Sequence, residues 1–291
     1  MPVADIIAAL RENPYHADQS VEELRAATEA RPQTLVDGSE IQPVDANGVP
    51  SEWLTCPQSR SSSTFLFIHG GGYYRGSPAS SRTITSHIAH YAEATTLSVD
   101  YRLAPEYPFP AAIDDVIAAY RWTLDQDVDP KRLVVGGLSA GGGLTLSLLL
   151  ALKESGDPMP AGAVALSAWA DLTQSADTYQ TNAANDPTIS KAYLDRMAEY
   201  YLAGTDAHTP LASPLFGDLS GLPPMLLQVG DVETLLDDTK AFATKATAAG
   251  ADVALEVWPG MFHGWHGNAG RLAEAREAIA AIGHFFKRVT G

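Results

Sequence analysis

The sequence has 291 residues, of which 45% are hydrophobic and 19% are charged. A chain of this length can bury a substantial core, and its composition is that of a globular protein, not of a disordered or fibrous one. The formal net charge of −16 argues against binding to nucleic acid or to anionic membranes, because both require basic patches. The single cysteine, Cys56, excludes an intrachain disulfide.

The first residues carry no pattern typical of a secretion signal. Asp5 occurs early, no basic segment precedes an apolar one, and no small-residue cleavage site follows. The longest apolar stretch, 144–152, is too short to span a bilayer. We therefore expect a cytoplasmic protein without membrane insertion.

The N-terminal region is predicted to contain helices followed by a hairpin. Apolar residues recur at helical spacing within 1–31, and Asn13-Pro14 interrupts this pattern. Residues 34–55 are expected to be extended, with a hairpin turn at Asn47-Gly48.

From residue 64 onward, short apolar runs alternate with amphipathic segments. The apolar runs, which we expect to be buried strands, are 65–68, 96–99, 133–135, 164–166, 225–229 and 253–257. The helical patterns cover about 80–93, 111–125, 141–154, 235–249 and 271–288. This alternation predicts an α/β fold, with a mostly parallel sheet that helices cover on both faces.

A long insertion, 169–223, separates two of the predicted strands and contains one clear helical pattern near 191–202. Long excursions in compact domains commonly act as lids or binding loops. We therefore expect residues 169–223 and 1–33 to form a cap within a single domain that spans 1–291.

Ser139 is the candidate nucleophile. It lies in Gly137-Leu138-Ser139-Ala140-Gly141, a Gly-x-Ser-x-Gly pattern directly after an apolar strand and directly before a helix. This is the arrangement of a strained elbow that exposes a serine, and side chains at the two glycine positions would collide with neighbouring backbone. The pattern alone also fits a turn without chemistry, but it is not a phosphate-binding loop, because no lysine follows the second glycine.

A second glycine-rich segment, His69-Gly70-Gly71-Gly72, closes the first long apolar strand. Acyl transfer requires two or three N–H donors aimed at the oxyanion of the tetrahedral intermediate. We predict that the N–H groups of Gly71, Gly72 and Ala140 supply them, that Gly70 serves the turn, and that His69 is a structural hydrogen-bonding residue and not a base. A flexible glycine loop is the alternative.

Together these motifs resemble those of the hormone-sensitive-lipase family of α/β-hydrolases, in its microbial carboxylesterase branch. The resemblance covers roughly residues 60–266 and is carried most specifically by 69–77, 99–112, 213–216 and 221–230. One position departs from it, since the family elbow usually has Asp or Thr where this chain has Leu138. The resemblance implies an α/β-hydrolase fold, hydrolysis of short- to medium-chain carboxylic esters, and no metal or cofactor.

The same resemblance implies the other two members of a catalytic triad. It places the acid at Glu233, after the strand at 225–229, with Asp231 as the alternative. It places the base at His263, in the His-Gly pair after the last strand, whereas His266 is expected at the surface. In the implied mechanism His263 takes the proton of Ser139, and Glu233 orients the imidazole.

Aromatic residues near these motifs are candidates for the substrate pocket. Tyr73 and Tyr74 follow the glycine loop, and Phe262 precedes the histidine. The predicted partner is a small-molecule ester, and a lactone is an alternative substrate for the same triad. A non-catalytic binding homologue is a further alternative, which the presence of His263 disfavours. By analogy with the family, we expect a homodimer formed through the edge strand at about 252–258.

Overall fold

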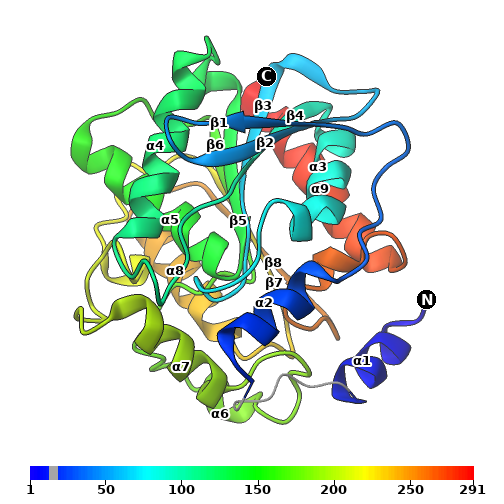
Figure 1. The fold of residues 1–291 in the computed structure, drawn as a ribbon. Coiled ribbons are helices and arrows are strands. Elements are labelled where there is room, and N and C mark those ends of the chain that lie inside the picture. The colour runs from blue at the N-terminus through cyan, green and yellow to red at the C-terminus, as the bar shows by residue number, and fades with distance from the viewer. Residues whose placement is uncertain (13–18) are drawn as a thin grey trace.

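The computed structural model describes residues 1–12 and 19–291. Within them lies an eight-stranded sheet with the order β1-β2-β4-β3-β5-β6-β7-β8 (Figure 1). The strands are β1 (Glu40–Asp45), β2 (Pro50–Thr55), β3 (Arg60–Ile68), β4 (Ala94–Val99), β5 (Leu133–Leu138), β6 (Gly162–Leu166), β7 (Met225–Gly230) and β8 (Val253–Trp258). Strand β2 pairs antiparallel with β1 and β4, and the other pairs are parallel, so the predicted mostly parallel sheet is confirmed.

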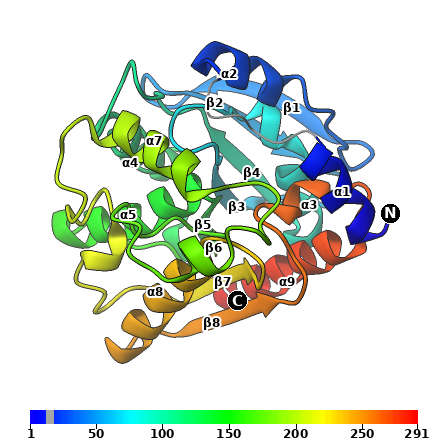
Figure 2. The ribbon, with the colours of Figure 1, turned by 90° about the horizontal axis from the view of Figure 1, so that it is seen from below.

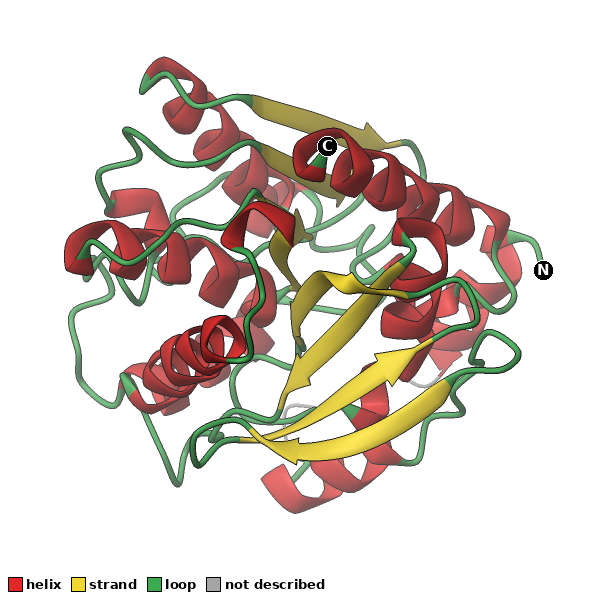
Figure 3. Cartoon of the chain, turned by 90° about the horizontal axis from the view of Figure 1, so that it is seen from above, coloured by secondary structure: helices red, strands yellow, loops and turns green. Residues whose placement is uncertain are grey.

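Helices cover both faces of the twisted sheet, as Figure 3 shows. The helices are α1 (Val3–Glu12), α2 (Val21–Glu29), α3 (Arg82–Ala92), α4 (Ala111–Asp125), α5 (Ala140–Ser155), α6 (Thr178–Thr181), α7 (Lys191–Leu202), α8 (Leu236–Ala248) and α9 (Ala273–Thr290). The predicted helices are confirmed, and α6 was not predicted because four residues are too few to show a helical period. The expected break at Asn13-Pro14 lies outside the described residues.

Alternate residues of the central strands serve two separate cores. Phe65 and Phe67 of β3 pack with α3 and α9, whereas Leu66 and Ile68 pack with α4 and α5. Successive side chains of a strand point to opposite faces of the sheet, so a strand buried on both faces must be apolar throughout. This explains why the predicted strands are continuous apolar runs.

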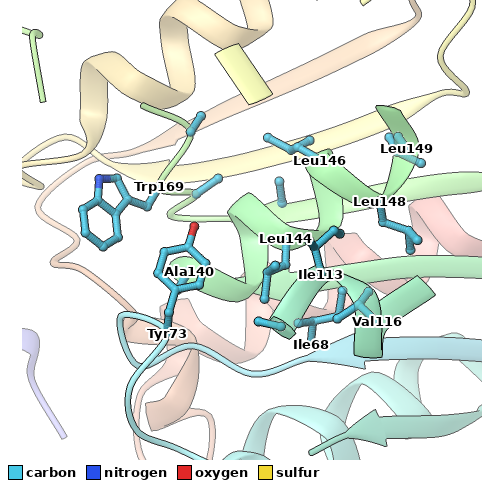
Figure 4. Close-up of a cluster of buried hydrophobic side chains, with 14 of the residues drawn as sticks. Ile68, Tyr73, Ile113, Val116, Ala140, Leu144, Leu146, Leu148, Leu149 and Trp169 are labelled. Carbon is cyan, nitrogen blue, oxygen red and sulfur yellow. The ribbon is translucent and has the colours of Figure 1, made fainter. Parts of the chain in front are cut away.

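Helix α5 is buried on nearly every side. Figure 4 shows Leu144 and Leu148 of this helix beside Ile113 and Val116 of α4, and all residues from Ala140 to Leu152 are buried. A helix that is apolar all round belongs inside the core. Its N-terminus, which follows Ser139, is therefore held rigidly by its surroundings.

The hairpin predicted before the central strands is confirmed. Strands β1 and β2 pair in register around a turn in which Asn47 and Gly48 both have positive φ, at 60° and 87°. Two successive positive φ values suit the tight turns that match the twist of a hairpin.

Helices α1, α2, α6 and α7 gather on one side of the molecule, along the lower edge of Figure 1 and toward the viewer in Figure 2. They come from the two segments that the sequence predicts as a cap. No helix among residues 1–12 and 19–291 is both long enough and apolar enough to cross a membrane.

Candidate active site

Ser139 occupies a strained turn between β5 and α5, with φ 57° and ψ −118°. The predicted crowding around this turn is confirmed. A Cβ at Gly137 would overlap the carbonyl oxygen of Gly141, and one at Gly141 would overlap the carbonyl oxygen of Ile68. The backbone therefore accepts only glycine at both positions, and the turn holds the serine at the carboxyl end of the central strand.

Three side chains from distant parts of the sequence form one hydrogen-bonded chain. The Oγ of Ser139 lies 2.9 Å from Nε2 of His263, whose Nδ1 lies 2.9 Å from Oε2 of Glu233. Asp231, the alternative acid, is exposed, and its Oδ1 accepts a hydrogen bond from the N–H of Gly260 at 2.6 Å. The structure thus brings Glu233, and not Asp231, to the histidine.

The second carboxylate oxygen of Glu233 is held just as firmly as the first. Its Oε1 accepts hydrogen bonds from Ser167 Oγ at 2.8 Å and from the N–H of Gly230 at 2.6 Å. The side-chain amide of Asn182 donates to the backbone carbonyl of Glu233 at 2.8 Å. The Oδ2 of Asp186 accepts a hydrogen bond at 2.9 Å from the N–H of Thr234, the residue that follows Glu233.

The sequence analysis did not find these supporting residues. Ser167 follows an apolar run at the carboxyl end of a parallel strand, where polar groups of α/β sheets commonly converge, so its position was a usable signal. Asn182 and Asp186 lie in the long insertion, and no local pattern marks them.

Burial and pairing act in opposite directions on the two titrating groups. Burial alone would lower the pKa of His263, but the hydrogen bond and the charge of Glu233 outweigh it, so the pKa of His263 lies above its ordinary value. Burial raises the pKa of Glu233, and the hydrogen bond with His263 opposes this only in part. The geometry accordingly favours a charged imidazolium next to a carboxylate once His263 has taken a proton.

The loop 69–72 leaves its N–H groups open beside Ser139. Within the described part of the chain, the N–H groups of Gly71, Gly72 and Ala140 donate to no protein acceptor. Gly72 has φ 62°, and a Cβ there would overlap the side chain of Met197 from α7. His69 is buried, and its Nδ1 lies 2.8 Å from the carbonyl oxygen of Gly70, so its predicted structural character is confirmed.

A cavity of about 520 Å³ opens over these groups. Its wall includes Ser139, His263 and the three loop glycines, and it also includes Phe262, as predicted. The two segments expected to form the cap contribute Ala9, Leu10, Thr28, Arg31, Pro32, Gln33, Thr188, Ile189, Leu194 and Met197.

Tyr73 and Tyr74 are not among the residues that line this cavity. Tyr73 stacks on Tyr201 at a centroid distance of 3.7 Å and lies beside Trp169 (Figure 4), while the hydroxyl of Tyr74 bonds that of Tyr193. Both rings are buried in the core, which corrects their predicted place in the pocket. Leu138, the residue that departs from the family pattern, does line the cavity.

His266 is fully buried, so its predicted surface position is wrong. The short helix Trp265–Asn268 folds the chain back over the sheet, where Nε2 of His266 lies 3.0 Å from Oε1 of Gln228 in β7. Burial lowers the pKa of His266 to about 3, which keeps the ring neutral.

Residues 65–267 match a family defined by the alpha/beta hydrolase fold. An acetyl-hydrolase of Streptomyces hygroscopicus is 42% identical, over 100% of this chain and 98% of that protein. An esterase of Acinetobacter venetianus is 35% identical, over 84% of this chain and 81% of that protein. The crystal structure of an esterase from the bacterial hormone-sensitive lipase family has a TM-score of 0.96 and 44% identity, and the match covers 99% of this chain and 98% of that one. This chain therefore belongs to the hormone-sensitive-lipase family of α/β-hydrolases and is a carboxylic ester hydrolase.

Proposed function

We propose that this enzyme hydrolyses short- to medium-chain carboxylic esters through an acyl-enzyme on Ser139. The observation that carries the proposal is the continuous hydrogen-bonded chain from Ser139 through His263 to the buried carboxylate of Glu233. His263 takes the hydroxyl proton as Ser139 attacks the ester carbonyl, and Glu233 stabilises the imidazolium that forms. The imidazolium then protonates the leaving alcohol, and water repeats the cycle on the acyl-enzyme.

The N–H groups of Gly71, Gly72 and Ala140 are the proposed donors to the oxyanion. They come from two parts of the cavity wall, since two lie on the glycine loop and the third begins α5, and they would donate to the ester's carbonyl oxygen, on which the negative charge develops. The partial positive charge at the N-terminus of α5 adds to their effect. Donors that are fixed before the reaction stabilise charge that develops only in the transition state.

The proposed substrate size rests on two supports. The volume of about 520 Å³ is within the range of small-molecule pockets and must hold both the acyl and the alcohol parts. A relative named acetyl-hydrolase points to small acyl groups. We assign residues 1–33 and 169–223 as the cap, because both segments contribute to the cavity wall, and Phe262 as part of the pocket.

A series of p-nitrophenyl esters from acetate to dodecanoate tests this proposal. We expect kcat/KM to be highest at short or medium chains and turnover to vanish in Ser139→Ala, while the variant melts at the same temperature as the wild type. A maximum at dodecanoate would contradict the proposed chain length. Turnover retained by Ser139→Ala would contradict the nucleophile.

We also propose a homodimer through β8, the last strand at one edge of the sheet. Leu255 and Val257 of this strand are each 38% exposed, which suits pairing with a second copy along an open edge. Light scattering after gel filtration should give twice the mass of one chain, and Val257→Lys should lower it. A wild-type protein that elutes as a monomer would contradict this assignment.

A further inference from the structure

The loop that carries His263 has little regular structure of its own. We call residues 259–272, which join β8 to α9, the histidine loop; they contain only the short helix Trp265–Asn268, of which His266 is a part. Among the described residues, the backbone N–H and C=O groups of His263 form no hydrogen bond. The position of the catalytic ring on the sheet must therefore be fixed by other residues of this loop.

Strand β7 is the surface on which the histidine loop rests. A Cβ at Gly230 would overlap the carbonyl oxygen of Met261, so the loop and the strand are in direct contact there. Two residues earlier in the strand, Oε1 of Gln228 lies 3.0 Å from Nε2 of His266. Side chains two residues apart in a strand lie on the same face of the sheet. The loop is thus held on one face of β7 at two points, one before and one after His263.

The side-chain amide of Gln228 is fully buried, and both of its polar atoms have partners. Its Nε2 donates to Oε2 of Glu256 in β8 at 2.8 Å and to the carbonyl oxygen of Ala278 in α9 at 3.0 Å. Turning the amide over would place its oxygen against two acceptors, so Oε1 must face His266. The neighbouring β8 and α9 (Figure 2) therefore fix the direction of the acceptor that β7 presents to the loop.

His266 is held as a neutral hydrogen-bond donor. Its Nε2 faces an acceptor and must carry the ring proton, while its Nδ1 is buried without a partner among the described residues. The ring packs on that of Trp265 at a centroid distance of 3.8 Å. Burying an unpaired nitrogen costs stability, and an apolar ring would avoid this cost. The hydrogen bond to Gln228 is therefore the feature that distinguishes His266 from an apolar residue at this place.

Gln228 also supports the acid of the triad. Its backbone carbonyl accepts a hydrogen bond from the N–H of Ser167 at 2.7 Å. The hydroxyl of Ser167 in turn donates to Oε1 of Glu233 at 2.8 Å. One residue of β7 is thus connected to the acid through its backbone and to the loop of the base through its side chain.

We propose that His266 and Gln228 are positioning residues for ester hydrolysis. Their hydrogen bond keeps His263 within reach of both Ser139 and Glu233. The proposal rests on the proposed function, since it takes His263 as the base. A displacement of about 1 Å in such a group can cost about 10²-fold in rate. Neither His266 nor Gln228 is among the described residues that line the cavity, so the pair should affect kcat and leave KM nearly unchanged.

Replacements of His266 test this inference with p-nitrophenyl butyrate as substrate. His266→Phe keeps an aromatic ring but removes the donor, and we expect kcat to fall by about 10- to 100-fold while KM stays within about threefold. His266→Gln places an amide NH₂ near the position of Nε2 and should retain most of the activity. His266→Asn has an amide one carbon shorter, which cannot reach Gln228, and should lose as much as His266→Phe. The glutamine and asparagine variants carry the test if His266→Phe does not fold.

A second variant and a matched control separate the hydrogen bond from burial in general. Gln228→Met removes the acceptor, and the variant with both Gln228→Met and His266→Phe should lose about as much kcat as either single variant, because the bond can be lost only once. The control is His87→Phe. His87 is also buried, its Nδ1 lies 2.7 Å from the carbonyl oxygen of Thr83, and it does not line the cavity, so kcat should stay within about twofold.

Proton NMR gives a readout that a purely structural role would not change. The proton on Nδ1 of His263, which faces Glu233, should give a downfield signal in the wild type that is absent in Glu233→Gln. We expect this signal to broaden or disappear in His266→Phe and to remain in His266→Gln and His87→Phe.

Wild-type kcat in folded His266→Phe and His266→Asn would overturn the inference, and so would equal losses in His266→Asn and His266→Gln. Either result leaves the proposed function intact, provided that the wild type hydrolyses the ester and Ser139→Ala does not. Absence of hydrolysis by the wild type would instead contradict the proposed function itself.

Discussion

Replacing Glu233 with glutamine should reverse the roles of the two imidazole nitrogens. Oε1 of Glu233 accepts from the N–H of Gly230 and from Ser167, so the amide oxygen of a glutamine must stay on that side. The amide NH₂ would then face Nδ1 of His263 as a donor, and Nδ1 would have to accept. The ring proton would then lie on Nε2, the nitrogen that faces Ser139. A protonated Nε2 has no lone pair to accept the serine proton, so His263 could not act as the base.

A wrong tautomer of this kind costs about 10⁴-fold in kcat in serine hydrolases of the triad type, or about 5.5 kcal/mol. We expect a loss of this order in kcat/KM for p-nitrophenyl butyrate, with little change in the folded fraction, because the replacement has nearly the same shape. Asp231→Asn is the matched control. That carboxylate is exposed and accepts only from Gly260 among the described residues, so we expect less than about a threefold change. Equal losses in both variants, or more than a tenth of the activity left in Glu233→Gln, would refute the reasoning.

Three further predictions follow from the same geometry. Ser167→Ala removes the hydrogen bond to the buried carboxylate of Glu233 and should lower kcat/KM by about 10- to 100-fold. Ser167→Thr keeps a hydroxyl group and should lose less activity, whereas a Ser167→Ala variant as active as the wild type would contradict a role for this hydrogen bond. The kcat/KM of the wild type should fall at low pH with a midpoint above pH 6.5, because His263 must be neutral to act and Glu233 raises its pKa. This midpoint should move to lower pH in Glu233→Gln, and an unchanged midpoint would contradict the effect of Glu233 on His263. The free energy of unfolding should fall by up to about 1.4 kcal/mol for each pH unit below pH 6.5, because His266 is protonated in the unfolded chain but stays neutral when buried in the folded one. Denaturant titrations at several pH values should give a smaller dependence of this free energy on pH for His266→Gln, and an identical dependence would contradict the burial.

The layered architecture and the elbow could be predicted because both depend on local sequence. Apolar runs such as 65–68 mark strands buried on both faces, and Asn47-Gly48 marks a turn that few other residues can form. Glycine is required on either side of Ser139 because any side chain there would overlap neighbouring backbone atoms. Every turn of this geometry has the same requirement, so the pattern can be recognised from sequence. Each of these features is visible within a window of about ten residues.

The direction of single side chains could not be predicted in the same way. Tyr73 and Tyr74 lie next to the glycine loop in sequence, but both rings point into the core. There they contact α7, where Tyr73 stacks on Tyr201 and the hydroxyl of Tyr74 bonds that of Tyr193. His266 turns inward because the helix Trp265–Asn268 folds its loop over the sheet. These outcomes depend on contacts between segments far apart in the chain, which no local pattern encodes.

The support of the acid illustrates the same limit at the site itself. Asn182 and Asp186 hold the backbone around Glu233 from a segment some 50 residues earlier in the chain, with separations of 51 and 48 residues. Nothing in their immediate sequence distinguishes them from other polar residues of a long insertion. Only the three-dimensional structure shows that this insertion lines the cavity and also forms hydrogen bonds with the backbone at Glu233 and Thr234.

The most direct test of the central claim is to trap the acyl-enzyme. The protein would be mixed with p-nitrophenyl butyrate, quenched in acid within one turnover, digested, and analysed by mass spectrometry. We predict one butyryl group on the peptide that contains Ser139, a longer-lived adduct in Glu233→Gln than in the wild type, and no adduct in Ser139→Ala. A butyryl group on another residue, or hydrolysis that continues undiminished in Ser139→Ala, would contradict the account.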